Sequence, residues 1–215
     1  MVIVAKQKEP RLSQAMQDIL NKSHADGGNE CFNDNERYKF RIMQMLTNNQ
    51  DVLWTLHNKE LEEKSSYTTK DKDGNKIEML NGDAYKNVSI FNFLKIPEIQ
   101  STVKNYICFE VNDVEQPRYN KDFIIKNIIF RTVSHEDDYI TDWGIARQDL
   151  LATIIQSEFD WTNAFGLHLE KVTDRGRVAE NGYYYREFIY ETNVPNNLRN
   201  KLKNGGMKGD YGAFR

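Results

Sequence analysis

Carboxylates gather most densely between residues 134 and 149, in the run Ser134-His135-Glu136-Asp137-Asp138 and then at Asp142 and Asp149. A metal-dependent nuclease or hydrolase collects such groups because Mg²⁺ prefers oxygen ligands and orients the attacking water. The residues that would serve this chemistry are His135, Asp137, Asp138 and Asp142. Consecutive residues cannot all face one ion, however, and no companion motif occurs elsewhere. The sequence therefore favours a solvated loop that leads into a helix cap.

Other catalytic patterns are missing from the sequence. Gly-x-Ser-x-Gly, His-Glu-x-x-His and Gly-x-x-x-x-Gly-Lys do not occur. Cys31 and Cys108 are too few for a disulfide scaffold, and neither belongs to a Cys-x-x-Cys pair of the kind that holds structural zinc. We therefore expect no catalytic residue, no cofactor and no metal, and we expect that the protein is not an enzyme.

Arg147 lies in the first turns of a predicted helix, where the positive end of the helix dipole disfavours an arginine. It therefore needs an anionic partner. Two alternatives stay open: a local ion pair with Asp138 or Asp142, and a salt bridge to a neighbouring subunit. In the run of three tyrosines at 183–185, at least one ring must point away from the packed face. We expect Tyr184 to be the ring that is available to a partner.

The elements that must position these residues form a predicted α+β core. Helices are expected at about 35–48 and 49–58, and a longer amphipathic helix at 142–157 with Asp142 as its cap. Strands are expected at 106–111 and 123–133, and a closing hairpin pairs 167–174 with the aromatic strand 183–190. The predicted architecture is an antiparallel or mixed sheet of about four strands with the long helix packed on it.

Three segments fall outside this core pattern. Residues 1–33 are predicted to be an extended N-terminal arm and residues 196–215 an extended C-terminal tail. The core domain, 34–195, contains an exposed insertion at 59–87, with Asp71 and Lys72 in a turn-forming stretch at its tip. The remaining chain has the length of one domain.

Charge and hydropathy exclude two classes of function. The chain has 29 Lys and Arg against 32 Asp and Glu, a net charge of −3. It has no basic block of the kind that drives non-specific nucleic-acid binding, so any contact with DNA should be transient. Its apolar runs are far shorter than the roughly 18 residues that span a bilayer, and no membrane helix is expected.

The order of the predicted elements resembles that of the tail terminator proteins of long-tailed bacteriophages. The resemblance covers about residues 35–192 and is carried by the helical region 36–56, the strands 106–111 and 123–133, the helix 142–157 and the hairpin 167–190. It implies a hexameric or dodecameric ring at the head-to-tail junction of a virion, assembled in the host cytoplasm. Such a ring caps the tail tube and joins it to the capsid connector, and DNA passes through its lumen.

The resemblance also sets the expected partners and interface. The partners are further copies of the chain, other phage neck, tail-tube or connector proteins, and DNA in transit. The expected interface residues are Arg147, Asp138, Asp142, Tyr184, Asp71 and Lys72. A head-closure, adaptor or collar protein is an alternative. Two further alternatives are a metal-dependent nuclease or hydrolase that uses the 135–142 acidic cluster, and an adaptor that binds a host protein through the 59–87 insertion.

Overall fold

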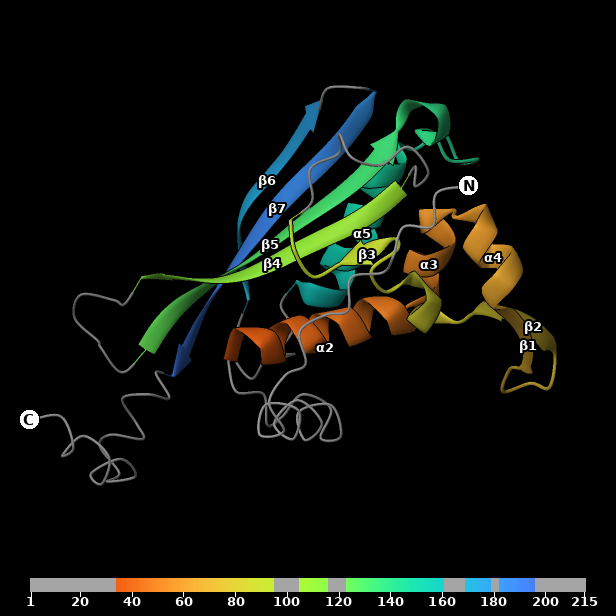
Figure 1. The fold of residues 1–215 in the computed structure, drawn as a ribbon, viewed down its shortest axis with the longest axis horizontal. Coiled ribbons are helices and arrows are strands. Elements are labelled where there is room, and N and C mark those ends of the chain that lie inside the picture. Colours follow the sequence, from red (N-terminus) through yellow and green to blue (C-terminus); the bar gives the residue numbers. More distant parts are fainter. Residues whose placement is uncertain (1–33, 95–104, 116–122, 161–168, 179–181, 196–215) are drawn as a thin grey trace, which may run out of the picture.

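A computed structural model describes residues 34–94, 105–115, 123–160, 169–178 and 182–195 of the chain. The predicted arm (1–33) and tail (196–215), and Cys31 with them, lie outside the described residues. The described residues contain a main core, built from helices and a sheet (Figure 1), and a smaller cluster of buried side chains, Phe91, Tyr106, Cys108, Val133 and Tyr183.

The described helices are α2 (Asp34–Asn48), α3 (Gln50–Leu56), α4 (Lys59–Ser65) and α5 (Arg147–Phe159), with short 3-10 turns η1 (Gly82–Tyr85) and η3 (Glu136–Asp138). The helices predicted at 35–48 and 49–58 are confirmed. Asn49 and Asn58 begin α3 and α4, because the side-chain oxygen of each accepts a backbone N–H of the first turn of its helix. In the described part of the chain, no helix is long and apolar enough to cross a membrane.

A five-stranded sheet lies beside the helices, in the order β3 (Ile90–Phe91), β4 (Asn105–Glu115), β5 (Phe123–His135), β7 (Tyr183–Pro195) and β6 (Glu170–Val178). Its neighbours are antiparallel except for β3, which pairs parallel with β4. The fold is therefore α+β with a mixed sheet, as predicted. Strand β3 was not predicted, because a strand of two residues is too short to show a repeating pattern.

The core lies between one face of the sheet and helices α2, α3 and α5 (Figure 1). Phe109, Phe130 and Phe188 stand on adjacent strands, and the Phe130 ring lies 5.3 Å from that of Phe188 and 5.1 Å from that of Phe159 on α5. All four rings are fully buried. Burial of each such ring stabilises the fold by about 1.5–3 kcal/mol, so this aromatic group fixes α5 on the sheet.

The long helix begins later than the sequence indicated. α5 starts at Arg147, its N-cap is Ala146, and no side chain caps it, so the prediction that Asp142 caps the helix is wrong. Residues 139–146 instead form a turn closed by a β-bridge between Ile140 and Ala146, with Gly144 at a φ of 74°. A glycine that adopts positive φ ends regular structure at this point, and the helix can start only after it.

The 59–87 segment contains α4, a separate hairpin of β1 (Ser66–Lys70) with β2 (Lys76–Leu80), and η1. Asp71 closes the hairpin, since its Oδ1 accepts the backbone N–H groups of Asp73 at 2.9 Å and Asn75 at 2.7 Å. The hairpin is largely exposed, whereas Leu80 and Tyr85 at the end of the segment are buried in the core.

Candidate functional site

Asp138, on η3, lies at the centre of a polar group that joins four elements. Its Oδ1 accepts from Nη2 of Arg147 at 2.9 Å, and its Oδ2 accepts from Nδ2 of Asn105 at 2.5 Å. The same Oδ2 lies 2.9 Å from Nδ1 of His57, which follows α3. We call these four residues, Asp138, Arg147, Asn105 and His57, the Asp138 cluster.

Arg147 is 7% exposed, and its guanidinium is directed into the fold. Besides the carboxylate of Asp138, it donates to the backbone carbonyl of Asp138 from Nε at 2.9 Å and to that of Thr55 from Nη1 at 3.0 Å. The local ion pair between Arg147 and Asp138, one of the two predicted alternatives, is confirmed. Arg147 therefore ties the start of α5 to the end of α3 and to η3.

His57 and Glu62 complete the electrostatics of this region. His57 has a φ of 49°, in the left-handed region, where its N–H closes α3 by donating to the Trp54 carbonyl at 3.2 Å. Burial raises the pKa of the Glu62 carboxyl, and the nearby charges of His57 and Arg147 offset only part of this rise. The cluster thus contains both signs of charge in a partly buried place.

The acidic stretch does not converge on one point. Asp138 contacts the other three residues of the Asp138 cluster. The Nδ1 of His135 instead accepts the backbone N–H of Asp137 at 3.3 Å. The side chains of Glu136, Asp137 and Asp142 are exposed. Among the described residues, no three His, Cys, Asp or Glu side chains are placed to hold a metal ion. The carboxylates considered for a nuclease therefore have separate surroundings.

The 139–146 turn presents apolar side chains to solvent. Its backbone is fixed by hydrogen bonds from the N–H of Thr141 to the carbonyl of Ile145 and from the N–H of Gly144 to the carbonyl of Thr141, both 2.9 Å. The Arg147 N–H donates to the Tyr139 carbonyl at 2.7 Å and so joins the turn to α5. Its exposed apolar residues are Ile140 (56%), Trp143 (77%) and Ile145 (46%). A rigid turn of this composition is the candidate interaction site.

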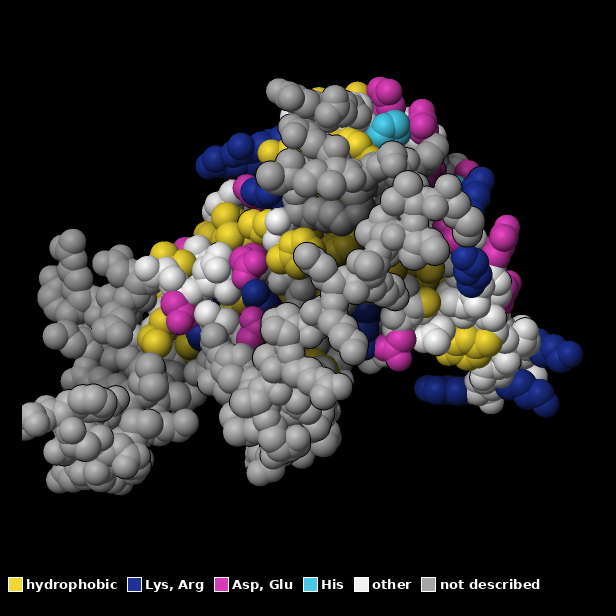
Figure 2. All heavy atoms as spheres, in the orientation of Figure 1, with side chains coloured by type: hydrophobic (Ala, Val, Ile, Leu, Met, Phe, Trp, Pro, Cys, Tyr) yellow, Lys and Arg dark blue, Asp and Glu magenta, His cyan; other side chains and the backbone are white. Residues whose placement is uncertain are grey.

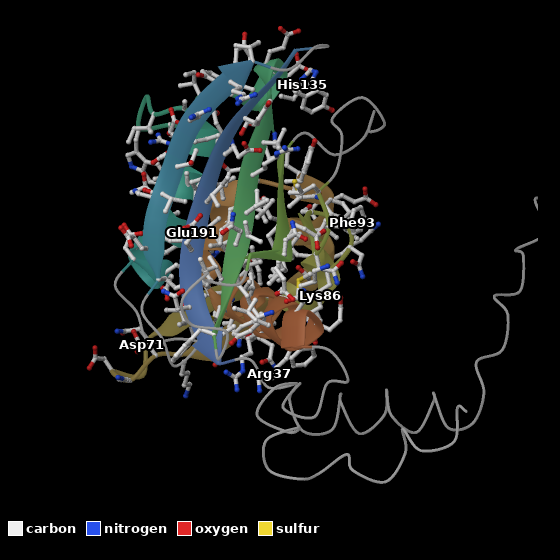
Figure 3. The ribbon with its side chains drawn as sticks, turned by 90° about the vertical axis from the view of Figure 1, so that its left-hand side faces the viewer. Arg37, Asp71, Lys86, Phe93, His135 and Glu191 are labelled. Carbon is white, nitrogen blue, oxygen red and sulfur yellow. The ribbon has the colours of Figure 1, made fainter. Side chains whose placement is uncertain are left out.

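The other expected interface residues lie in two places. Tyr184 is half-buried on β7, with its ring 4.5 Å from that of Tyr139, beside the turn. At the hairpin tip Lys72 is exposed and Asp71 is half-buried, and Figure 3 shows Asp71 at the opposite end of the molecule from His135. A backbone hydrogen bond from Asn75 lowers the pKa of Asp71.

Sequence reasoning missed three residues of this region. His57 and Asn105 join Asp138 across 81 and 33 residues of chain, and no local pattern signals contacts of that range. Trp143 did carry a signal, since it stands between Asp142 and Gly144, where a large aromatic residue has no helical face to join.

The chain is similar to a protein family and, weakly, to a solved structure. The family model YomW matches residues 41–192, which include the Asp138 cluster and the 139–146 turn. Among solved structures, a chain of the "Virion of native gene transfer agent (GTA) particle" aligns with a TM-score of 0.35 and 10% identity, over 50% of this chain and 79% of that chain. That score is too low to support a shared fold. No curated protein matches the chain.

Proposed function

This chain belongs to the YomW family, a family associated with bacteriophages, and from that membership we propose that it is a structural protein of a phage virion. Its proposed place is the head-to-tail junction, where copies form a ring that caps the tail tube and joins it to the capsid connector. DNA passes through the lumen of this ring. The protein acts by holding its neighbours in place and catalyses no reaction.

The observation that carries the proposal is the exposed 139–146 turn. Trp143 is 77% exposed although its ring is among the most apolar groups of the chain, and contact with another protein would remove that area from water. Tryptophan is also enriched among the residues that dominate binding energies. Because the turn is already fixed by its own hydrogen bonds, little conformational entropy is lost when it binds.

The proposed interface assigns distinct roles to the expected residues. Asp138 and Arg147 are positioning residues, since they hold the base of the turn from inside the fold. Asp142 and Tyr184 lie on or beside the turn and contact the neighbouring copy. Asp71 and Lys72, at the hairpin tip, contact another phage protein.

The pairing of basic side chains supports the passage of DNA. Arg131 pairs with Glu187 and Arg186 with Asp174, so that carboxylates neutralise these cations within the chain. Neutralised cations attract phosphates weakly, and a wall built from such pairs lets DNA slide.

Native mass spectrometry and electron microscopy of the purified full-length protein test the proposal, together with antibody labelling of virions. We expect closed rings in solution and labelling at the neck. A strictly monomeric protein that is absent from virions would contradict it. A Mg²⁺-dependent nuclease activity that Asp138→Ala abolishes, without effect on assembly, would favour the enzymatic alternative.

A further inference from the structure

We propose that neighbouring copies in this ring join head to tail, with the 139–146 turn of one copy bound to the outer edge of β6 of the next copy. The inference rests on the proposed function for the existence of a ring. It adds which two surfaces meet and which chemistry holds them together.

The turn and its flank form an acidic surface around an apolar tip. Residues 134–146 contain four carboxylates and no Lys or Arg. Of these carboxylates, Asp138 faces inward, whereas Glu136 and Asp142 are exposed beside Ile140, Trp143 and Ile145. A partner for this surface needs apolar groups together with cations.

The outer edge of β6 has that chemistry. β6 is the last strand of the sheet, and none of the described strands pairs with its outer side. Arg175 and Arg177 are two residues apart, point to the same face and are exposed. Their side chains form no ion pair or hydrogen bond with any other described residue, although Arg131 and Arg186 nearby are both paired. On the same strand, Val172, at a register shift of β6, exposes 45% of its surface, and Val178, on the other face of the strand from Arg175 and Arg177, exposes 73%.

The two surfaces complement each other group by group. A guanidinium stacks on the face of a tryptophan ring, where cation–π attraction adds to contact area. Arg175 or Arg177 can take this position on Trp143, and the other can pair with Asp142. The exposed Val172 of β6 supplies apolar cover for Ile140 and Ile145. A second copy of the chain therefore supplies every group that the turn needs.

The positions of the two surfaces fit a contact that repeats. Figure 1 shows the green turn beyond the end of β5 at the upper right, while β6 forms the left edge of the sheet. Figure 2 shows Lys and Arg side chains gathered at the β6 edge and Asp and Glu side chains at the opposite upper end. Each copy that uses its turn still has a free edge, so the contact adds copies until a ring closes.

Two double variants of the full-length protein test the inference. The turn variant carries Asp142→Arg and Trp143→Ser, and the edge variant carries Arg175→Glu and Arg177→Glu. Sedimentation velocity and native mass spectrometry measure the size of the assemblies. We expect each variant to be monomeric, with a dissociation constant between copies raised by about 30-fold or more. The matched control, Tyr67→Ser with Lys76→Glu on the exposed hairpin, should assemble like the unchanged protein.

Mixing the two variants gives the sharpest result. The turn variant retains an intact β6 edge and the edge variant retains an intact turn, so a 1:1 mixture should form a heterodimer and nothing larger. That result also shows that both variants are folded. Rings of unchanged size in either variant, or a mixture that stays monomeric, would overturn the inference and leave the proposed ring standing. A monomeric unchanged protein that is absent from virions would instead remove the proposed function.

Salt provides a second measurement on the unchanged protein. Because the contact includes ion pairs at a surface, raising NaCl from about 0.05 M to about 0.5 M should weaken assembly. An assembly that is indifferent to salt would contradict the ion pairs. Loss of duplex DNA binding in the edge variant, with normal rings, would assign Arg175 and Arg177 to DNA and overturn the inference.

Discussion

A single carboxylate holds the candidate site together, and its removal should be costly. Asp138→Ala leaves the guanidinium of Arg147 buried without its anionic partner, and we expect it to lower the free energy of unfolding by about 3 kcal/mol. Urea unfolding followed by circular dichroism measures this change. Asp142→Ala is the matched control: its carboxylate is exposed, and the expected change is within about 0.5 kcal/mol. Equal effects of the two substitutions would refute a structural role for Asp138.

A second carboxylate, Asp174, makes part of the stability depend on pH. Burial alone would raise the pKa of Asp174, but hydrogen bonds from Arg186 and Gln156 outweigh burial and lower it. A carboxyl whose pKa is lower in the folded state stabilises the fold above its unfolded pKa of about 3.9, and this stability is lost as pH falls through the folded pKa.

Arg186→Met should therefore cost about 1 kcal/mol at neutral pH, a small value because the pair is partly exposed. The difference from the unchanged protein should shrink as the pH falls below about 4. Chemical unfolding across this pH range measures both effects, with Lys72→Met as the control at an exposed lysine. A difference that stays constant down to low pH would show that the pair with Asp174 is not its source.

At the scale of single residues, the sequence predicted contacts only between residues that are close together in the chain. The pair of Arg147 with Asp138 was predictable because the two residues are close in sequence, at the connection between β5 and α5. A cation at the start of a helix is unfavourable unless an anion lies near it, and Asp138 is such an anion. His57 and Asn105 were not predictable. Their contact with Asp138 depends on how α3 and β4 pack, which no local spacing encodes.

Among the elements, η1 shows how tightly one turn fits against a helix. A Cβ at Gly82 would overlap the carbonyl oxygen of Thr47 and lie 2.8 Å from the Cβ of that residue, near the end of α2. Gly82→Ala should therefore push η1 off the helix and lower the free energy of unfolding by about 1–3 kcal/mol. Gly176→Ala is the control, since a Cβ there meets nothing within 4 Å. Thermal unfolding compares the two, and equal stability would mean that η1 moves without cost.

Element types were easier to predict than element ends. α2, β5 and β7 have long apolar or aromatic patterns, so both type and position followed from periodicity. The start of α5 did not, because Asp142 and Asp149 look alike as first-turn residues until Gly144 is known to take a positive φ. The turn chemistry at 141–145 therefore decided a boundary that helix preference alone placed too early.

At the scale of the whole molecule, the outer part of the hairpin of β1 and β2 is exposed, and its removal distinguishes the functional alternatives. Thr69 and Ile77 face each other in the hairpin, so the segment 70–76 between them, the tip of the hairpin with Asp71 and Lys72, can be replaced by Asn-Gly, which suits a two-residue turn. The exposed residues that this removes contribute little to the core. We expect a free energy of unfolding within about 0.5 kcal/mol of the original.

The shortened protein should still form rings by native mass spectrometry, because the turn and the β6 edge are untouched. Its incorporation into virions should fall, since the hairpin is the proposed contact with another phage protein. Complementation of a phage that lacks this gene measures incorporation. Loss of the ring itself would show that the hairpin lies between copies. Normal virions would show that the hairpin makes no required contact in the virion. Normal virions combined with loss of binding to a host protein would favour the adaptor that binds its partner through the 59–87 insertion.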